Sequence, residues 1–128
     1  MLLQGSLDLT LHEEFNSSSL KSTTEIMSEL QNSITHYTYT EGTHQQASFD
    51  HLLDYGASYY GYLWSEVYAA DMYSVFEKEG LLNLETGLHF RRTILEKGGS
   101  ENPMNLVKAF LRRDPNNEAF LKNHGIID

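Results

Sequence analysis

The stretch YGASYYGYLWSEVYAADMY, residues 55–73, carries six tyrosines and the only tryptophan of the chain. Its periodicity predicts a helix from about Asp54 to Lys78, ended by Gly80, which suits the left-handed conformation after a helix C-terminus. In that helix, Tyr55, Tyr59, Tyr62 and Tyr73 would share one face, with Tyr60, Trp64 and Tyr68 on the other side. A helix that is apolar all round is typical of the middle of a protein, so this helix is expected to be buried.

Helical patterns also precede this stretch. Leucines among residues 2–13 alternate as in a strand and also recur at helical spacing, and of the two we favour a helix. Ser22 and Glu25 form a capping-box pattern that predicts a second helix behind them. The polar stretches 16–22 and 36–48 are expected to be loops. The predicted fold class is therefore all-α, a helical bundle.

Three more helices are expected in the C-terminal half. Asn83 is a candidate cap for a helix from about Leu84 to Lys97, which Gly98 and Gly99 end. Proline suits the first helical position, because the N–H that it lacks would have no helical partner there. Such starts occur at Asn102-Pro103, ahead of a helix through Leu111, and at Asp114-Pro115, ahead of a short helix closed by Gly125. The expected buried residues of the first helix are Leu84, Leu88, Ile94 and Leu95.

The composition excludes several classes of function. The chain has 128 residues, a length typical of one domain, so residues 1–128 are expected to form a single helical domain. With 18 Asp and Glu against 9 Lys and Arg, it lacks the basic clusters that bind nucleic acid. No cysteine is present, which excludes disulfides and thiolate metal sites. No apolar run approaches the ~18 residues of a membrane span, so we expect no membrane partner.

Two groups of residues could carry chemistry. Tyr55, Tyr59 and Tyr62 would point three hydroxyls to one side, where phenols could hydrogen-bond a carbonyl oxygen as negative charge develops on it. The alternative, which spacing alone favours, is that they are core aromatics with backbone partners. Arg91 would either pair with a carboxylate inside the protein or hold a ligand carboxylate, and the pattern alone favours the internal pair.

A metal site is not expected within this chain. Six histidines are present, but the nearest approach to the zinc motif HExxH is His12-Glu13-Glu14-Phe15-Asn16, in which asparagine replaces the second histidine. No other His, Asp and Glu residues sit at a convincing ligand spacing. We therefore expect no residue of this chain to be a metal ligand.

Long segments of the chain nevertheless resemble one known family. FDHLLDYGASYYGYLWSEVYAADMY, GLLN with GLHFRRTILEKGGSENP, and FLRRDPNNEAFLKNHGI are similar, in the same order, to the C-terminal part of the thimet oligopeptidase family of zinc metallopeptidases. That family includes neurolysin, saccharolysin and mitochondrial intermediate peptidase. The resemblance is strong over residues 49–128 and weaker over residues 1–48, which contain the long loop.

The resemblance implies a fold, an activity and roles for particular residues. The fold would be the C-terminal part of a larger, mostly helical, two-lobed peptidase that cuts short peptides with a zinc ion held by HExxH and a distant glutamate. Tyr62 resembles the family tyrosine that hydrogen-bonds the oxyanion. Tyr59 and Tyr55 resemble its neighbours in the substrate cleft, His51 resembles a substrate-contacting histidine, and Arg91 resembles a cleft arginine. The resemblance thus moves the tyrosines from expected core to expected site.

Two departures from the family accompany the resemblance. Family loops ahead of the first tyrosine are typically glycine-rich, whereas this chain has Leu52, Leu53 and Asp54 there. Arg112 stands where the family usually has glycine. The zinc ligands would lie outside this chain.

We therefore expect a C-terminal fragment that needs the missing N-terminal part of a peptidase, and that alone neither binds zinc nor cuts peptides. The alternative is an inactive helical module that binds peptides or a protein partner and can self-associate. The resemblance leaves two locations open, since the 61–68 stretch is closer to cytosolic members and the loop spacing closer to the mitochondrial one. We expect a cytoplasmic protein, with mitochondria as the alternative.

Overall fold

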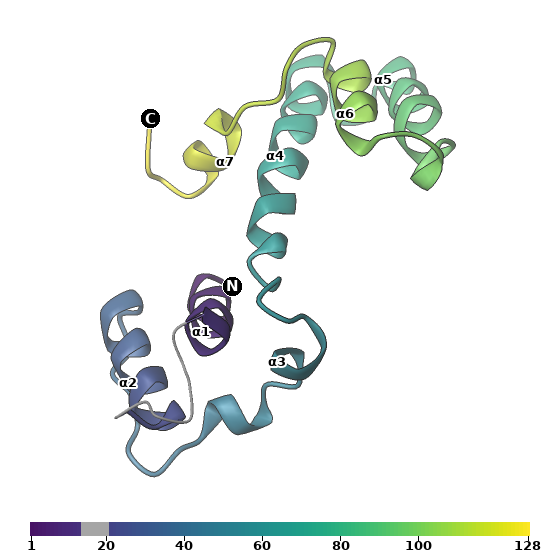
Figure 1. The fold of residues 1–128 in the computed structure, drawn as a ribbon. Helices are drawn as coiled ribbons and strands as arrows, with labels where there is room; N and C mark the ends of the chain where they lie inside the picture. The colour runs from purple at the N-terminus through teal and green to yellow at the C-terminus, as the bar shows by residue number, and fades with distance from the viewer. Residues whose placement is uncertain (14–20) are drawn as a thin grey trace. The chain divides into compact units, whose positions relative to one another are not determined.

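A computed structural model describes residues 1–13 and 21–128, which form helices joined by loops, with no strand among them (Figure 1). The predicted all-α class is confirmed for this part of the chain. The chain divides into two compact units, Met1–Leu63 and Trp64–Asp128. No helix in the described ranges is both long and apolar enough to cross a bilayer.

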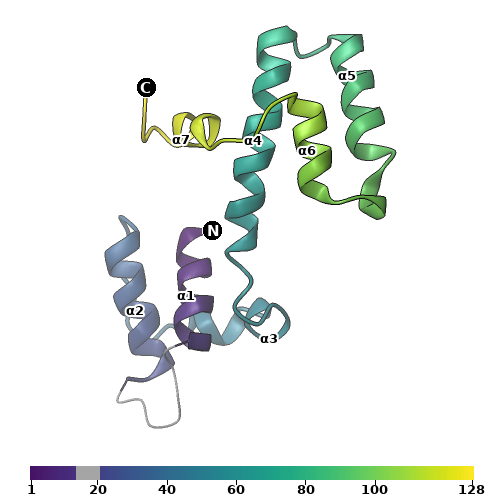
Figure 2. The same ribbon diagram turned by 45° about the horizontal axis from the view of Figure 1, so that its top comes forward.

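The first unit is built on two helices that lie side by side, α1 (Leu2–Glu13) and α2 (Thr23–Ile34) (Figures 1 and 2). Their buried contact consists of Leu7, Ile26 and Met27. A 3-10 turn, η1 (Gln45–Ser48), and a single helical turn, α3 (His51–Asp54), complete the unit. The choice of a helix for residues 2–13 is confirmed, and the expected loop at 36–48 is confirmed apart from η1.

The predicted capping box is present at the start of α2. Ser22 Oγ accepts a hydrogen bond from Glu25 N at 3.2 Å, and Glu25 Oε2 accepts one from Ser22 N at 2.6 Å. Each residue thereby satisfies an N–H that the helix leaves without a partner. Most of the loop expected at 16–22 lies outside the described residues.

The aromatic helix, α4 (Gly61–Glu79), starts seven residues later than the sequence predicts. Gly56 and Ala57 have φ values of 50° and 66°, and left-handed residues interrupt a right-handed helix. The prediction of one helix from Asp54 is therefore wrong, and Tyr55 and Tyr59 lie in the connection ahead of α4. Its predicted end is confirmed, since Gly80 has a φ of 107°.

The expectation that this helix is buried all round is also wrong. Trp64 is 61% exposed and Tyr73 48% exposed, whereas the buried residues of α4 are Ala70 and Asp71. The helix thus buries a narrow stripe that includes a carboxylate, and its aromatic residues lie largely at the surface of the described chain.

The second unit continues from α4 into α5 (Leu84–Phe90), a π-helical turn η2 (Arg91–Leu95), a 3-10 turn η3 (Gly98–Ser100) and α6 (Pro103–Leu111). Both predicted caps are confirmed. Asn83 Oδ1 accepts from Glu85 N at 2.9 Å, and Asn102 Oδ1 accepts from Met104 N at 2.9 Å. Phe76, Phe90 and Phe110 pack ring against ring at centroid distances of 5.3–5.9 Å.

Two of the four expected buried residues of the 84–97 segment are exposed. Leu84 is 72% and Leu95 63% exposed, while Leu88 and Ile94 are partly buried and Thr86 is the buried residue of α5. Leu84 is the first residue of its helix, and the π turn ahead of Leu95 inserts an extra residue that shifts the helical phase. A pattern with a constant period of 3.6 residues cannot follow such a shift.

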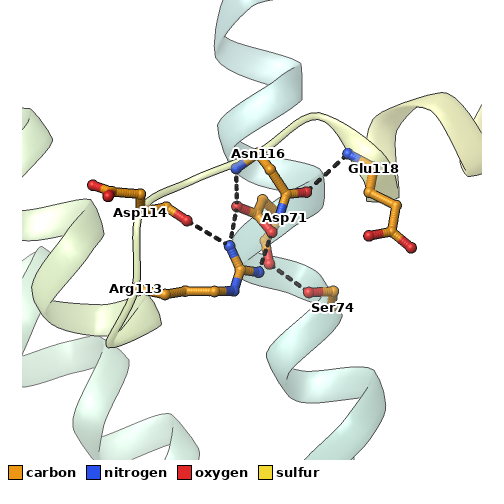
Figure 3. A network of polar contacts seen from close by, with 6 residues as sticks. All are labelled: Asp71, Ser74, Arg113, Asp114, Asn116 and Glu118. Carbon is orange, nitrogen blue, oxygen red and sulfur yellow. Dashed lines mark hydrogen bonds and ion pairs between the residues drawn. The ribbon is translucent and has the colours of Figure 1, made fainter.

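The last helix, α7 (Glu118–Asn123), begins later than the Asp114-Pro115 pair predicts, because Arg113 and Asn116 are hydrogen-bonded to Asp71 of α4. Figure 3 shows this contact: Arg113 Nη1 donates to Asp71 Oδ2 at 2.9 Å, its Nη2 donates to Asp71 Oδ1, and Asn116 N donates to Asp71 Oδ2 at 2.9 Å. Asn116 Oδ1 in turn accepts from Glu118 N at 2.9 Å. Gly125, with a φ of 65°, follows the helix as predicted.

Candidate functional site

The connection from α3 to α4 folds back on itself and brings four predicted site residues together. After the left-handed pair Gly56 and Ala57, a turn closes with Gly61 N donating to Ser58 O at 3.0 Å. Tyr62 N then donates to Tyr59 O at 3.2 Å as α4 begins. A helix could not place these side chains so, because residues 55 and 62 would be two turns apart.

We name His51, Tyr55, Tyr59 and Tyr62 the tyrosine cluster. Ring centroids lie 5.0 Å apart for His51 and Tyr55, 5.4 Å for His51 and Tyr59, and 5.9 Å for Tyr55 and Tyr59. Tyr62 lies 5.6 Å from Tyr55 and 4.9 Å from Tyr59. Such separations are those of favourable aromatic pairs. The cluster is therefore a packed group rather than a row along one helix.

Two phenols of the cluster are hydrogen-bonded to each other, Tyr55 Oη with Tyr62 Oη. This bond, followed by desolvation and by the nearby charges of Tyr62, Tyr59 and Asp54, raises the pKa of Tyr55 above its ordinary value of 10.0. Tyr55 thus stays a neutral phenol that can donate. Because one hydroxyl has one hydrogen, donation by Tyr55 leaves the hydrogen of Tyr62 free for another acceptor.

The cluster is open to solvent rather than sealed in a core. Tyr62 is 42% exposed, His51 is exposed, and Tyr55 and Tyr59 are partly buried. Tyr59 also borders a pocket of about 170 Å³ in the first unit, between α1, α2 and η1. The pocket is lined by Leu3, Gln4, Leu7, Met27, Gln45, Ser48, Phe49 and Tyr59. Exposed phenol donors beside a mostly apolar pocket can contact a peptide at both backbone and side chain.

A buried carboxylate that the sequence analysis did not single out lies behind the cluster. Asp8 of α1 is 0% exposed, and its Oδ2 accepts a hydrogen bond from Tyr59 N at 2.9 Å. The signal in the sequence is a lone charge in an otherwise apolar and small-residue run, LLQGSLDLTL. Its partner, 51 residues away, could not be read from that run.

Arg91, the fifth predicted site residue, belongs to the second unit. Its Nε lies 3.0 Å from Glu96 Oε1, in an ion pair whose side chains are 64% and 49% exposed. Arg91 thus has a carboxylate partner within the chain, but the pair lies at the surface and not inside the protein as the pattern suggested, so another carboxylate could replace Glu96.

The described residues do not fit the zinc ion that the family resemblance implies. Nowhere in residues 1–13 and 21–128 do three His, Cys, Asp or Glu side chains gather as a metal would require. His12, the start of the imperfect HExxH, instead lies with its Nδ1 3.0 Å from Asp8 Oδ1. The chemistry that these residues can offer is hydrogen bonding and ring contact.

Comparison with known proteins places the chain in a family. The model of peptidase family M3 matches residues 1–126. Oligopeptidase A of Salmonella typhimurium is 40% identical over 124 residues, which cover 95% of this chain and 18% of that protein. Oligopeptidase A of Escherichia coli is 39% identical with the same coverage.

Eukaryotic relatives match a shorter part of the chain. Saccharolysin of Saccharomyces cerevisiae is 42% identical over 81 residues, which cover 62% of this chain and 11% of that protein. The chain thus spans less than a fifth of the length of these relatives. Because the family model covers nearly all of its residues, this chain belongs to peptidase family M3.

Proposed function

We propose that this chain is the portion of an M3 zinc oligopeptidase that supplies phenol and ring contacts to a short peptide substrate. The observation that carries the proposal is the tyrosine cluster, in which the hydroxyl of the exposed Tyr62 is hydrogen-bonded with that of Tyr55. Family membership supports the substrate class, since the relatives are named oligopeptidases. The remaining polypeptide of the enzyme is the proposed partner.

The proposed role of Tyr62 is to donate a hydrogen bond to the scissile carbonyl oxygen. That bond strengthens as the oxygen becomes an oxyanion, so it stabilises the transition state more than the bound substrate. Removing one such donor typically lowers kcat by about 10²–10³-fold. In the proposed arrangement Tyr55 donates to the Tyr62 oxygen, which leaves the hydrogen of Tyr62 for the substrate.

The other predicted residues take supporting roles in the proposal. Tyr59 and His51 flank the two phenols and would contact the substrate through their rings. Arg91 would exchange its exposed partner Glu96 for a carboxylate of the peptide. The cytosol is the proposed location, with an organelle as the alternative, in line with the Arabidopsis thaliana relatives named "Probable cytosolic oligopeptidase A" and "Organellar oligopeptidase A, chloroplastic/mitochondrial".

Zinc, when bound by the complete enzyme, would polarise the peptide carbonyl and a water molecule. The residues described here provide no ligand set for it. The isolated chain is therefore expected to retain no stoichiometric zinc after dialysis and to leave a quenched fluorescent peptide uncut. Zinc-dependent hydrolysis by the purified chain would contradict this part of the proposal.

Peptide binding by the chain tests the site directly. With tyrosine labelled at ¹³Cζ, addition of a short peptide is expected to shift the NMR signals of Tyr55, Tyr59 and Tyr62. Tyr73, an α4 tyrosine of similar exposure outside the cluster, is the internal control. A shift at Tyr73 alone, or no shift at millimolar peptide, would overturn the proposed site.

A second candidate function, a binding module without activity, is favoured by the exposed apolar side chains. Leu82 is 99%, Leu53 89% and Trp64 61% exposed, and such residues commonly mark interfaces when they form patches. Under this alternative the chain self-associates or binds a protein partner. Sedimentation velocity between about 5 and 200 μM tests self-association: a monomer at every concentration would contradict it.

A further inference from the structure

We propose that Asp8 is a positioning residue for the tyrosine cluster: from α1 it caps the turn that leads into α4 and thereby fixes Tyr59 and Tyr62. The inference rests on the proposed function for its significance. Its structural content, a link between a buried carboxylate and the arrangement of the phenols, can be tested without any peptide.

The first argument is the hydrogen bond itself. Tyr59 N–H lies just ahead of the first turn of α4, where backbone N–H groups have no helical partner. Asp8 Oδ2 accepts from it at 2.9 Å. A carboxylate is the favoured acceptor there, because the N-terminus of a helix carries partial positive charge. Asp8 thus holds the turn ahead of α4, two residues before the first helical residue, Gly61.

The second argument is the close approach of α1 to the same turn. Gly5 is buried one turn before Asp8, and a Cβ added to it would lie 3.4 Å from Tyr60 Cα and 3.6 Å from Tyr60 N. Residues three apart share a helix face. Asp8 therefore binds the backbone of Tyr59, and Gly5 lets α1 approach the backbone of Tyr60 closely.

The third argument is that the Asp8 carboxylate is itself held in place. His12 Nδ1 lies 3.0 Å from Asp8 Oδ1 and 2.8 Å from the Asp8 carbonyl oxygen. One carboxylate oxygen thus faces His12 and the other faces Tyr59. Asp8 Oδ1 makes no hydrogen bond, so the bond from Tyr59 N is the carboxylate's hydrogen bond, and its loss would leave a fully buried polar group unsatisfied.

These contacts reach Tyr62 through the backbone of Tyr59. The N–H of Tyr59 is held by Asp8, and its carbonyl accepts from Tyr62 N at 3.2 Å. The Tyr59 ring packs 4.9 Å from that of Tyr62. Release of the N–H is expected to let this turn move and to loosen the bond between Tyr62 Oη and Tyr55 Oη, the main cause of the raised pKa of Tyr55.

The test compares Asp8→Ala and Asp8→Asn in the full chain labelled at tyrosine ¹³Cζ. We expect the pKa of Tyr55 to fall toward its ordinary value in Asp8→Ala. Asp8→Asn is expected to retain most of the raised pKa, because the amide oxygen can still accept from Tyr59 N–H. Asp71→Ala, which removes an equally buried carboxylate from the second unit, is the matched control and should leave Tyr55 unchanged.

An unchanged Tyr55 titration in a folded Asp8→Ala variant would overturn the proposal. If Asp8→Ala does not fold, amide exchange in the wild-type chain decides. Tyr59 N–H should then exchange as slowly as the core of α1, and exchange at the rate of an exposed amide would overturn the proposal. Failure to bind peptide would refute the proposed function alone, since neither readout contains a peptide.

Discussion

Asp8 and Asp71 are both almost completely buried carboxylates, one in each unit, yet they have different hydrogen-bond and ion-pair partners. Asp71 faces a full positive charge, the guanidinium of Arg113, and also accepts from Asn116 N. Asp8 accepts one backbone N–H, from Tyr59, and faces the imidazole of His12. A buried charge needs partners, and these two have partners of different strength.

The different partners indicate different roles: Asp71 stabilises the second unit, whereas Asp8 orients residues of the tyrosine cluster. The partners of the Asp71 carboxylate all belong to the segment between α6 and α7, so this contact ties a loop to a helix within the second unit. The partner of Asp8 is the backbone of a proposed site residue. We therefore expect substitution of Asp71 to lower mainly the stability of the second unit, and substitution of Asp8 to change mainly the phenols.

The largest expected effect follows from Asp71→Ala. It removes a two-pronged bond to Arg113 and a backbone bond to Asn116, and hydrogen bonds to charged groups contribute about 1.5–3 kcal/mol. Because Arg113 is 41% exposed and can return to water, we expect a loss of about 2–3 kcal/mol. Urea unfolding followed by Trp64 fluorescence measures it. Asp114→Ala, which breaks an exposed pair with Lys108, should cost under about 1 kcal/mol. An equal loss of stability in the two variants would contradict a special contribution of the buried Asp71.

Acid should weaken the Asp71 contact in a defined direction. Burial by itself would raise the pKa of Asp71, but the bonds from Arg113 and Asn116 and the Arg113 charge outweigh it and lower the pKa below 3.8. Its stabilisation is therefore present above about pH 3.8 and is lost as the pH falls through the lowered value. Unfolding free energies between pH 5 and pH 2 should fall more steeply for the wild type than for Asp71→Asn. Parallel curves would contradict the assignment.

A gain of stability is expected next to the same contact. Arg112 has a φ of 56° and a ψ of 25°, a left-handed conformation that disfavours side chains other than glycine. Arg112→Gly should stabilise the chain by about 1 kcal/mol, because the strain of that conformation is relieved. Thermal unfolding measures the change. Lower stability in the variant would mean that the arginine side chain makes a contact worth more than the strain.

The smallest effect on stability is expected for Tyr62→Phe, since Tyr62 is 42% exposed. Its spectroscopic effect should be clear, because the hydrogen bond with Tyr62 is the main cause of the raised pKa of Tyr55. Without that bond, Tyr55 should titrate closer to 10.0 in a ¹³Cζ-tyrosine experiment. Tyr73→Phe should leave Tyr55 unchanged, and the same fall in both variants would contradict a specific pair.

Local signals in the sequence predicted much of the fold. The caps at Ser22, Asn83 and Asn102 and the left-handed Gly80 are confirmed because each depends on residues within one turn. The predicted start of the aromatic helix is wrong because Ala57 adopts a left-handed conformation that its residue type does not indicate. Of the two departures from the family, the one at Arg112 has a visible consequence, since this arginine occupies a left-handed position that favours glycine.

The geometry of the candidate site was beyond such signals. The spacing of the tyrosines predicts one helical face, whereas they meet through a reversal of the chain between Tyr55 and Tyr59. The bond between Asp8 and Tyr59 joins residues 51 positions apart, and no spacing rule connects them. Residue types and roles were thus suggested by the resemblance, while the contacts that orient them required the folded chain.

The most direct test of the account replaces the matching segment of Escherichia coli oligopeptidase A, to which the chain is 39% identical over 124 residues, with this chain. In an active chimaera, Tyr62→Phe should lower kcat by about 10²–10³-fold with little change in KM, because the lost hydrogen bond acts on the transition state. Tyr73→Phe should leave kcat unchanged. An active chimaera in which Tyr62→Phe alters kcat by less than about threefold would contradict the proposed role of the tyrosine cluster.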